Sequence, residues 1–313
     1  MSIEANKRAT QLKNVLLKDI AQNNKLSAIE LTEKALHGIA DYGNALHPRS
    51  EDEMKQALIG IAEKVKQARP SVAALEHSLD SWIHGIQDSD CNSVLGLVSH
   101  AQQLSKALHD ENLKAIASIA EFAVDTLKSC HTIMTHSHCP AVFYTFKKLK
   151  DHNVEVITTE SRPGMEGLHL AKQLGKMGIH THYITDAQMG LFAPKADAIV
   201  VGADSILDDG SAISKSGSYL LALAAAQARV PYYVCCESFK FSDTSTETAR
   251  LENRNTAELN VPHSPLLQAH NIFFDVTPHN LITAYITETG LISPLNLKKH
   301  QLSQQQQRQK KLG

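Results

Sequence analysis

The sequence predicts an α/β protein, with an all-helical N-terminal domain followed by a doubly wound, mostly parallel sheet. Up to about residue 128, apolar residues recur at helical spacing. In residues 129–300, short apolar runs alternate with helical segments, which is the pattern of parallel strands joined by right-handed crossovers. Residues 301–313 are rich in glutamine and lysine and form a low-complexity tail.

The N-terminal domain, residues 1–128, contains five helical patterns. They span residues 11–22, 27–43, 51–68, 71–86 and 111–129. Ser27 and Ser50 stand where N-caps belong. Glu30 and Glu53 follow three residues later, as in a capping box.

The second domain contains six apolar runs that predict strands. They span residues 131–135, 154–160, 179–185, 198–204, 230–237 and 271–277. Helical segments lie between them at 141–150, 165–176 and 216–228, and a polar stretch at 242–265 is predicted to be irregular. This alternation is Rossmann-like, and such sheets bind ligands beyond the carboxyl ends of their strands.

Bulk composition narrows the class of protein. Of 313 residues, 42% are hydrophobic and 20% are charged, which is an ordinary globular balance. The net charge of −2 offers no overall basic surface for direct nucleic-acid binding. Five cysteines without a CxxC pair fit reduced thiols better than disulfides. The charged N-terminus and the lack of a long apolar run predict a cytoplasmic protein without a membrane segment.

Ionisable residues follow the predicted strands and should gather on one rim of the sheet. Asp204 ends the fourth run, and Arg162, Lys215 and Lys240 supply separate cations. Such cations suit a small phosphorylated ligand, together with backbone N–H groups at the helix start near Gly217. Neither GxGxxG nor GxxxxGKS/T occurs, which argues against a dinucleotide or P-loop protein. No cofactor and no metal site are predicted.

These residues also have purely structural interpretations. Asp204 could cap a turn, and Lys215 or Lys240 could be a solvated turn lysine. Arg162 could form an ion pair with Glu160. The spacing alone leaves both interpretations open.

Six segments carry a resemblance to a known superfamily. They are ARPSVAALEHSLDSW, IMTHSHCPAV, VITTESRPGMEGLHLAKQLGKMGI, VVGADSILDDGSAISKSGSYLLALAA, VPYYVCCESFKF and TPHNLITAYITETGLISP. In this order they resemble the alpha, beta and delta subunits of translation initiation factor 2B, ribose-1,5-bisphosphate isomerase and methylthioribose-1-phosphate isomerase. ESFKF and LITAYITETGLISP are most similar to the initiation-factor alpha subunit and the ribose bisphosphate isomerase.

The resemblance implies a site for a phosphorylated sugar on this rim, between the two domains. It implies that the isomerase proton transfers map to Ser137 and Asp204. The residues implied to contact the phosphate or the sugar are Arg69, Ser71, His136, His138, Arg162, Ser214, Lys215 and Lys240.

The chain departs from the isomerase pattern at several positions. Ser137 stands where the isomerases have Cys, and a hydroxyl is a far weaker acid than a thiol. Cys139 lies two residues later; it is either a partner for Asp204 or a small residue at a helix start, where the helix lowers a thiol's pKa. Ser214 replaces an Asn, and Lys25 stands in place of the Arg of an Arg-Gly-Ala motif whose Gly is lost.

These departures favour an initiation-factor-2B-like protein that binds a phosphorylated sugar in a regulatory or assembly role in translation initiation. The alternative is an aldose–ketose isomerase of a phosphorylated pentose, with Asp204 as general acid–base and Ser137 or Cys139 as its partner. A third interpretation is a structural interaction protein. The resemblance also implies a homodimer or higher oligomer, or a hetero-oligomer with related subunits.

Overall fold

The computed structural model contains two compact units, residues 1–114 and residues 115–313. It describes residues 2–23, 26, 28–69, 72–262 and 264–297. The predicted N-cap Ser27 and the predicted tail at 301–313 lie outside these residues. Within the described ranges, no helix is long and apolar enough to cross a bilayer.

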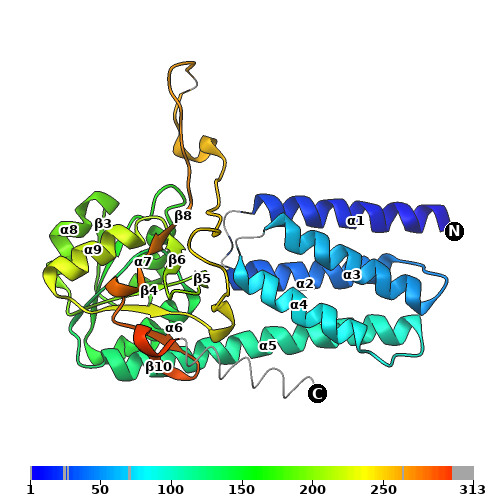
Figure 1. Ribbon diagram of the computed structural model, residues 1–313, viewed down its shortest axis with the longest axis horizontal. Helices are drawn as coiled ribbons and strands as arrows, with labels where there is room; N and C mark the ends of the chain where they lie inside the picture. Colours follow the sequence, from blue (N-terminus) through cyan, green and yellow to red (C-terminus); the bar gives the residue numbers. More distant parts are fainter. Residues whose placement is uncertain (1, 24–25, 27, 70–71, 263, 298–313) are drawn as a thin grey trace. The chain divides into compact units, whose positions relative to one another are not determined.

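The first unit consists of helices (Figure 1). They are α1 (Ser2–Gln22), α2 (Ala28–Ala45), α3 (Glu51–Ala68), α4 (Ala73–Gln87) and α5 (Val94–Leu127). The division between the units falls within α5, which begins well before the pattern predicted at 111–129. The core of the first unit includes Trp82, whose indole N–H donates to the Ala101 carbonyl at 3.0 Å and to Ser105 Oγ at 3.1 Å.

Helix α3 shows how the sequence specifies these helices. Its buried residues recur at intervals of three and four, at Met54, Leu58, Ile61 and Val65. The predicted N-cap is confirmed, because Ser50 Oγ accepts the Glu53 N–H at 3.2 Å. The Glu53 carboxylate accepts the Arg49 N–H at 2.7 Å, one residue before the cap.

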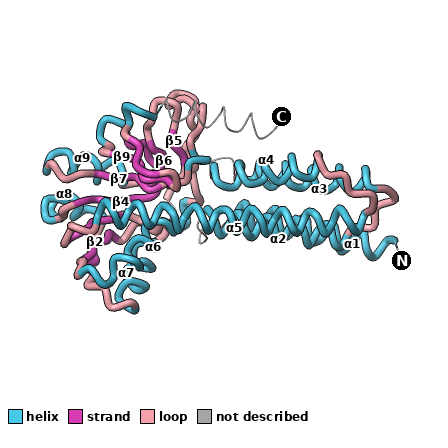
Figure 2. Tube along the Cα trace, turned by 90° about the horizontal axis from the view of Figure 1, so that it is seen from below, coloured by secondary structure: helices cyan, strands magenta, loops and turns pink. Residues whose placement is uncertain are grey.

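The second unit is built on a seven-stranded sheet in the order β10-β9-β7-β4-β1-β2-β3 (Figure 2). The strands are β1 (Thr132–Thr135), β2 (Glu155–Thr159), β3 (Thr181–Ile184), β4 (Ala198–Gly202), β7 (Tyr232–Cys235), β9 (Ala284–Thr287) and β10 (Gly290–Ile292). All neighbours are parallel except β9 and β10. The parallel strands therefore have the doubly wound order 3-2-1-4-5-6, and the predicted fold class is confirmed.

The helices between these strands match the predicted segments closely. Those predicted are α6 (Pro140–Leu149), α7 (Glu166–Lys176) and α9 (Ser218–Ala228), whereas the short α8 (Met189–Phe192) was not predicted. Buried side chains from the sheet and from α9 form one core, which includes Ile199, Val201, Leu221 and Tyr285. Cys235 and Cys236 are fully buried at the end of β7.

The prediction that residues 271–277 form the sixth parallel strand was wrong. This run contains β8 (Phe274–Thr277), which pairs antiparallel with β6 (Ala212–Lys215) in a small sheet ordered β5-β6-β8, with β5 at Ser205–Ile206. The sixth parallel strand is β9, only four residues long but buried throughout. A short apolar run indicates a strand but not the sheet that it joins.

The described residues of the polar stretch at 242–265 are irregular, as predicted, apart from a short 3-10 turn at Thr256–Leu259 and an isolated bridge between Asn253 and Ile272. Figure 1 shows that residues of this region leave the α/β unit as a narrow arm before β8. At its base, the Arg254 N–H donates to the Asn271 carbonyl and the Phe273 N–H donates to the Glu252 carbonyl. These bonds bring Glu252 and Arg254 back to the edge of the small sheet.

Candidate functional site

The candidate site lies at the carboxyl ends of β1 and β4, where the strand order reverses. From β1 the chain continues to β2 on one side, and β4 lies on the other, so this is the topological switch point, where sheets of this class bind their ligands. Residues 136–139 follow β1, and Asp204 follows β4. Gly202 allows the two ends to approach, because a Cβ at this position would collide with the Cys139 sulfur.

Lys240 is buried at this rim and is held by two acceptors. Its Nζ lies 2.7 Å from Glu237 Oε2 and donates to the Ala203 carbonyl at 2.9 Å. Burial alone would lower the pKa of Lys240. The acidic groups of Glu237, Cys139 and Asp204 have a larger effect in the opposite direction, so the pKa of Lys240 lies above its ordinary value. Lys240 is therefore a permanent cation that acts on both Cys139 and Asp204.

Asp204 is half-buried beside this lysine. Its backbone N–H donates to the Ile213 carbonyl at 2.8 Å, whereas within the described chain its carboxylate accepts no hydrogen bond. Burial raises the pKa of Asp204, and the charge of Lys240 opposes the rise. A carboxyl group with a raised pKa is suited to accept and return a proton, and also to bind a sugar hydroxyl.

Cys139 is the N-cap residue of α6. Burial raises the pKa of its thiol, although Lys240 and the N–H groups of Val142 and Ala141 act in the opposite direction. The lowering expected for a thiol at a helix start is therefore outweighed by burial. The neutral thiol packs against Gly202.

Ser137 adopts a left-handed backbone conformation with φ of 67°. Its N–H donates to Ser161 Oγ at 2.8 Å, which fixes the turn after β1 to the turn after β2. Its half-buried hydroxyl has no hydrogen-bond partner in the part of the chain that the structure describes. The hydroxyl is therefore free to meet a ligand.

Asp186, which follows β3, fixes the conformation of the turn after β2. Its two carboxylate oxygens accept the N–H groups of Ser161 and Arg162, each at 2.8 Å. Ser161 is buried with φ of 60°, and the Arg162–Pro163 peptide bond is cis. The turn leaves the Arg162 side chain exposed, and the ion pair considered with Glu160 is not seen among the described residues.

His136 is buried and uses both ring nitrogens within the protein. Nδ1 accepts the Thr159 hydroxyl at 2.6 Å, and Nε2 donates to the Ser216 carbonyl at 2.9 Å. Burial lowers the pKa of His136 to about 4, which keeps the ring neutral. Its position suits a residue that ties β1, β2 and the start of α9 together rather than a cation that binds phosphate.

Lys215 lies at the end of β6 in an enclosed setting. Its Nζ lies 3.2 Å from Glu166 Oε1 and 3.4 Å from the centroid of the Phe273 ring. The Arg254 guanidinium lies 3.1 Å from the same centroid. Burial lowers the pKa of Lys215, and Glu166 opposes the decrease. The second oxygen of Glu166 is buried and has no hydrogen-bond partner among the residues that the structure describes.

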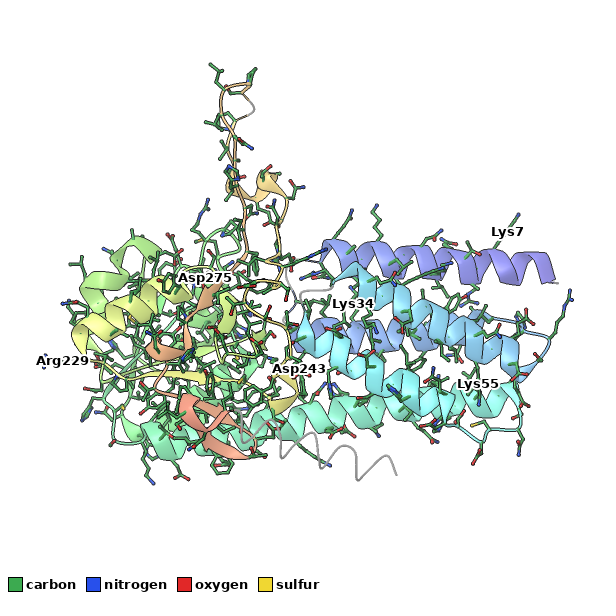
Figure 3. The ribbon with its side chains drawn as sticks, in the orientation of Figure 1. Lys7, Lys34, Lys55, Arg229, Asp243 and Asp275 are labelled. Atoms are coloured by element: carbon green, nitrogen blue, oxygen red, sulfur yellow. The ribbon has the colours of Figure 1, made fainter. Side chains whose placement is uncertain are left out.

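The start of α9 is already occupied by a carboxylate. Asp275 on β8 accepts the Gly217 N–H at 2.6 Å and the Tyr219 N–H at 3.2 Å (Figure 3). Burial raises the pKa of Asp275 to about 6, against the effect of these N–H groups. The prediction that this helix start presents free N–H groups to a phosphate was therefore wrong, because Asp275 caps it.

Ser214 and His138 hold neighbouring elements in place. Ser214 Oγ donates to the Gly202 carbonyl at 2.9 Å and so joins the small sheet to the end of β4. His138 Nε2 lies 2.9 Å from Gln173 Oε1 on α7. Each contact reinforces the rim.

Arg69 belongs to the helical unit. It is the C-cap residue of α3 and is buried, and its Nη1 donates to the Asn23 carbonyl at 2.8 Å and to the Ile20 carbonyl at 3.5 Å. It thereby satisfies carbonyl groups at the end of α1. Ser71 and Lys25 lie outside the described residues.

The α/β unit therefore brings together Asp204, Cys139 and Lys240, and it places Ser137 on the adjoining turn. Glu237 and Asp186 lie at the ends of predicted strands, but the sequence alone does not indicate the roles that the structure gives them. Glu166 and Asp275 gave no signal, because they meet Lys215 and Gly217 only through tertiary folding.

The fold and the rim together define a doubly wound α/β protein with a polar switch-point site. The model of the Initiation factor 2 subunit family matches residues 25–294, and the chain belongs to this family.

Known relatives include proteins described as initiation-factor subunits and proteins described as sugar-phosphate isomerases. The chain is similar to an eIF-2B subunit 2-like protein of Pyrococcus furiosus, with 35% identity over 250 residues, 78% of this chain and 84% of the relative. It is similar to the ribose 1,5-bisphosphate isomerase of Archaeoglobus fulgidus, with 32% identity over 252 residues, 78% of this chain and 79% of that enzyme. The crystal structure of the Pyrococcus horikoshii translation initiation factor eIF-2B superposes with a TM-score of 0.75 and 30% identity, covering 90% of this chain and 97% of that one.

Proposed function

We propose that this chain binds a phosphorylated sugar at the switch-point rim and acts in regulation or assembly rather than as an isomerase. One observation carries the proposal. The Asp204 carboxylate and the Ser137 hydroxyl lie half-buried on the turns that flank the switch point, and neither is hydrogen-bonded within the described chain. A carboxylate accepts hydrogen bonds and a serine hydroxyl both donates and accepts them, so these two accessible groups suit the hydroxyl groups of a sugar.

The cations divide into two kinds. Lys215 and Lys240 are buried beside Glu166 and Glu237, so each contributes little net charge. Arg162 is exposed on the turn ordered by Asp186, and its guanidinium can bind phosphate through two parallel hydrogen bonds. We therefore assign the phosphate to Arg162 and the sugar hydroxyls to Asp204 and Ser137.

The second candidate is an aldose–ketose isomerase of a phosphorylated pentose. It is favoured by the similarity to a ribose 1,5-bisphosphate isomerase and by Lys240, whose charge acts on both Asp204 and Cys139. In that reaction Asp204 would move the proton between C1 and C2. The Cys139 thiol, whose raised pKa keeps it neutral, is a poor partner for it, which favours binding without turnover.

Thermal unfolding and a product assay separate the two functions. Ribose 1,5-bisphosphate and methylthioribose 1-phosphate are each added to the protein, and a ligand of the folded state raises Tm. We expect a shift in the parent and in Lys172→Ala, an exposed cation of α7, and its loss in Arg162→Ala. We expect no ketose product. Turnover that Asp204→Asn abolishes would establish the isomerase instead, and no shift with either sugar phosphate would exclude both functions.

We also propose that the chain forms a homodimer through its α/β unit. Helix α9 has no charged residue, and Leu220 and Leu223 on it are exposed, Leu220 by 64%. Leu191 on the adjacent α8 is exposed as well. An apolar helix face of this kind is normally covered by another surface, and a second copy of the same face is complementary to it. Assembly with related subunits stays a prediction.

A further inference from the structure

A second polar cluster lies at the opposite end of the sheet from the candidate site. Glu155 is the first residue of β2, His180 directly precedes β3 and His182 lies within β3. Val156 pairs with Thr181, so the three polar side chains start neighbouring strands in parallel register. Because side chains alternate along a strand, residues 155, 180 and 182 share one face of the sheet.

The donor atoms of this triad have the spacing of a metal site. One donor atom from each of the three residues lies within 4.8 Å of the other two donor atoms. Glu155 Oε2 is 3.2 Å from Nε2 of His182, and Glu155 Oε1 is 3.4 Å from Nδ1 of His180. Ligand distances of about 2.0–2.1 Å around a tetrahedral Zn²⁺ place neighbouring donors roughly 3.3 Å apart. Each imidazole nitrogen thus lies at about this distance from one of the two oxygens of the Glu155 carboxylate.

We propose that Glu155, His180 and His182 bind a divalent transition-metal ion, with Zn²⁺ as the best match. Two imidazole nitrogens and one carboxylate are a ligand set that Zn²⁺ accepts, whereas Mg²⁺ and Ca²⁺ prefer oxygen ligands. Three protein ligands leave a fourth position for water. The side chains are exposed by 49%, 66% and 42% respectively, so an ion reaches them without any opening of the fold.

The ion would join an edge strand to its neighbour. β3 is the edge strand of the seven-stranded sheet and, among the described strands, pairs with β2 alone. An ion held by His180, His182 and Glu155 would therefore link this edge strand to its neighbour where both strands begin. The site is separate from the switch-point rim, which lies at the carboxyl ends of the strands. Metal binding at this site therefore does not depend on the sugar-phosphate proposal.

The same contacts without a metal would be two exposed His–Glu pairs, which contribute little to stability. Such pairs would bind metal no better than the other surface histidines of a chain that has 17. Metal affinity and coordination geometry therefore distinguish the two interpretations, whereas stability alone does not.

Metal titration tests the proposal on the full chain after dialysis against a chelator. Co²⁺ binding is followed by visible absorption and Zn²⁺ binding by calorimetry. We expect one saturable equivalent, the absorption bands of tetrahedral Co²⁺, and displacement of Co²⁺ by Zn²⁺. The double variant His180→Ala/His182→Ala should weaken binding by about 100-fold or more, and Glu155→Gln by about tenfold or more.

The matched control is His37→Ala/His84→Ala, which removes two other exposed histidines, each bonded to a carbonyl of its own helix. It should bind as the parent does, and circular dichroism verifies that every variant is folded. The proposal is overturned if the parent shows no saturable equivalent. It is equally overturned if the double variant at 180 and 182 binds as tightly as the control.

Discussion

Lys215 and Lys240 were predicted as separate cations at the rim. In the structure both lysines are buried, and they form ion pairs with Glu166 and Glu237 respectively. Glu237 is three residues from its partner, but Glu166 is 49 residues away, and only folding brings it to Lys215. The sequence therefore indicates that charged residues gather at the rim, but not that they neutralise one another there. This difference moves the expected phosphate contact to Arg162.

The Glu237–Lys240 pair gives a prediction about stability. Lys240→Ala leaves a buried carboxylate without its partner, and such changes cost about 3–5 kcal/mol. The apolar double variant Lys240→Met/Glu237→Leu should recover most of this loss, because it removes both buried charges. Urea unfolding measures each variant. If the unfolding free energy of Lys240→Ala lies within about 1 kcal/mol of the parent value, the pair is not buried as described.

His136 gives a prediction about pH. Its pKa is about 4 in the folded protein and 6.5 when unperturbed, so the unfolded chain takes up the proton first. The folded state therefore loses stability as pH falls from 6.5 towards 4, by roughly 3 kcal/mol in total. His136→Gln keeps a donor and an acceptor but does not titrate.

The measurement is the unfolding free energy of parent and His136→Gln at about pH 7 and about pH 4.5. The advantage of the parent should shrink or reverse at the lower pH. Asp275 titrates in the same region but is common to both proteins, so it cancels from the difference. A difference that stays constant with pH would mean that the ring is not held neutral.

At the scale of the elements, the end of β4 and the start of α6 meet at Gly202 and Cys139. Gly202→Ala should destabilise the protein by about 1–3 kcal/mol, because the added methyl group collides with both the sulfur and the Cβ of Cys139. Cys139→Ala should not rescue it, since the Cβ remains, whereas Cys139→Gly should rescue it in part.

Gly175 on α7 is the matched control for this substitution. A Cβ there meets no atom within 4 Å, so Gly175→Ala should stabilise the protein by about 0.5–1 kcal/mol through helix propensity. Thermal or urea unfolding ranks the variants. If Gly202→Ala is as harmless as Gly175→Ala, the two strand ends do not approach as closely as the structure shows.

The elements differ in how far the sequence predicts them. The alternation of apolar runs and helical segments correctly predicts five of the parallel strands and the helices α6, α7 and α9, but not the short α8. Residues 271–277 were placed in the wrong sheet, and β9 was missed, because pairing partners depend on tertiary contacts that a four-residue run does not encode. The capping of α9 by Asp275 could not be predicted for the same reason. The register between β8 and β6 places the Asp275 carboxylate at the start of the helix.

At the scale of the whole molecule, the exposed apolar face of α8 and α9 predicts self-association. Leu220→Glu/Leu223→Glu introduces charges into the proposed interface and should convert a dimer into a monomer at micromolar concentration. Leu95→Glu changes a leucine on α5 that is more exposed than either of these two, and it should leave the mass unchanged. Light scattering reports the mass. A parent protein that is already monomeric would contradict the proposal.

The sequence also predicts the family, since six ordered segments resemble it and the family model matches residues 25–294. It does not predict the metal triad. His180 and His182 are two residues apart, but their partner Glu155 lies on another strand, and only the register of β2 and β3 brings it to them. Composition and motif spacing cannot reveal a site of this kind.

The central proposal is that the switch-point rim holds a phosphorylated sugar, and a crystal structure with ribose 1,5-bisphosphate tests it most directly. We expect a phosphate within hydrogen-bonding distance of the Arg162 guanidinium. We expect sugar hydroxyls within the same distance of the Asp204 carboxylate and the Ser137 hydroxyl. Density for the ligand elsewhere on the molecule, or none at this rim under saturating ligand, would contradict the proposal.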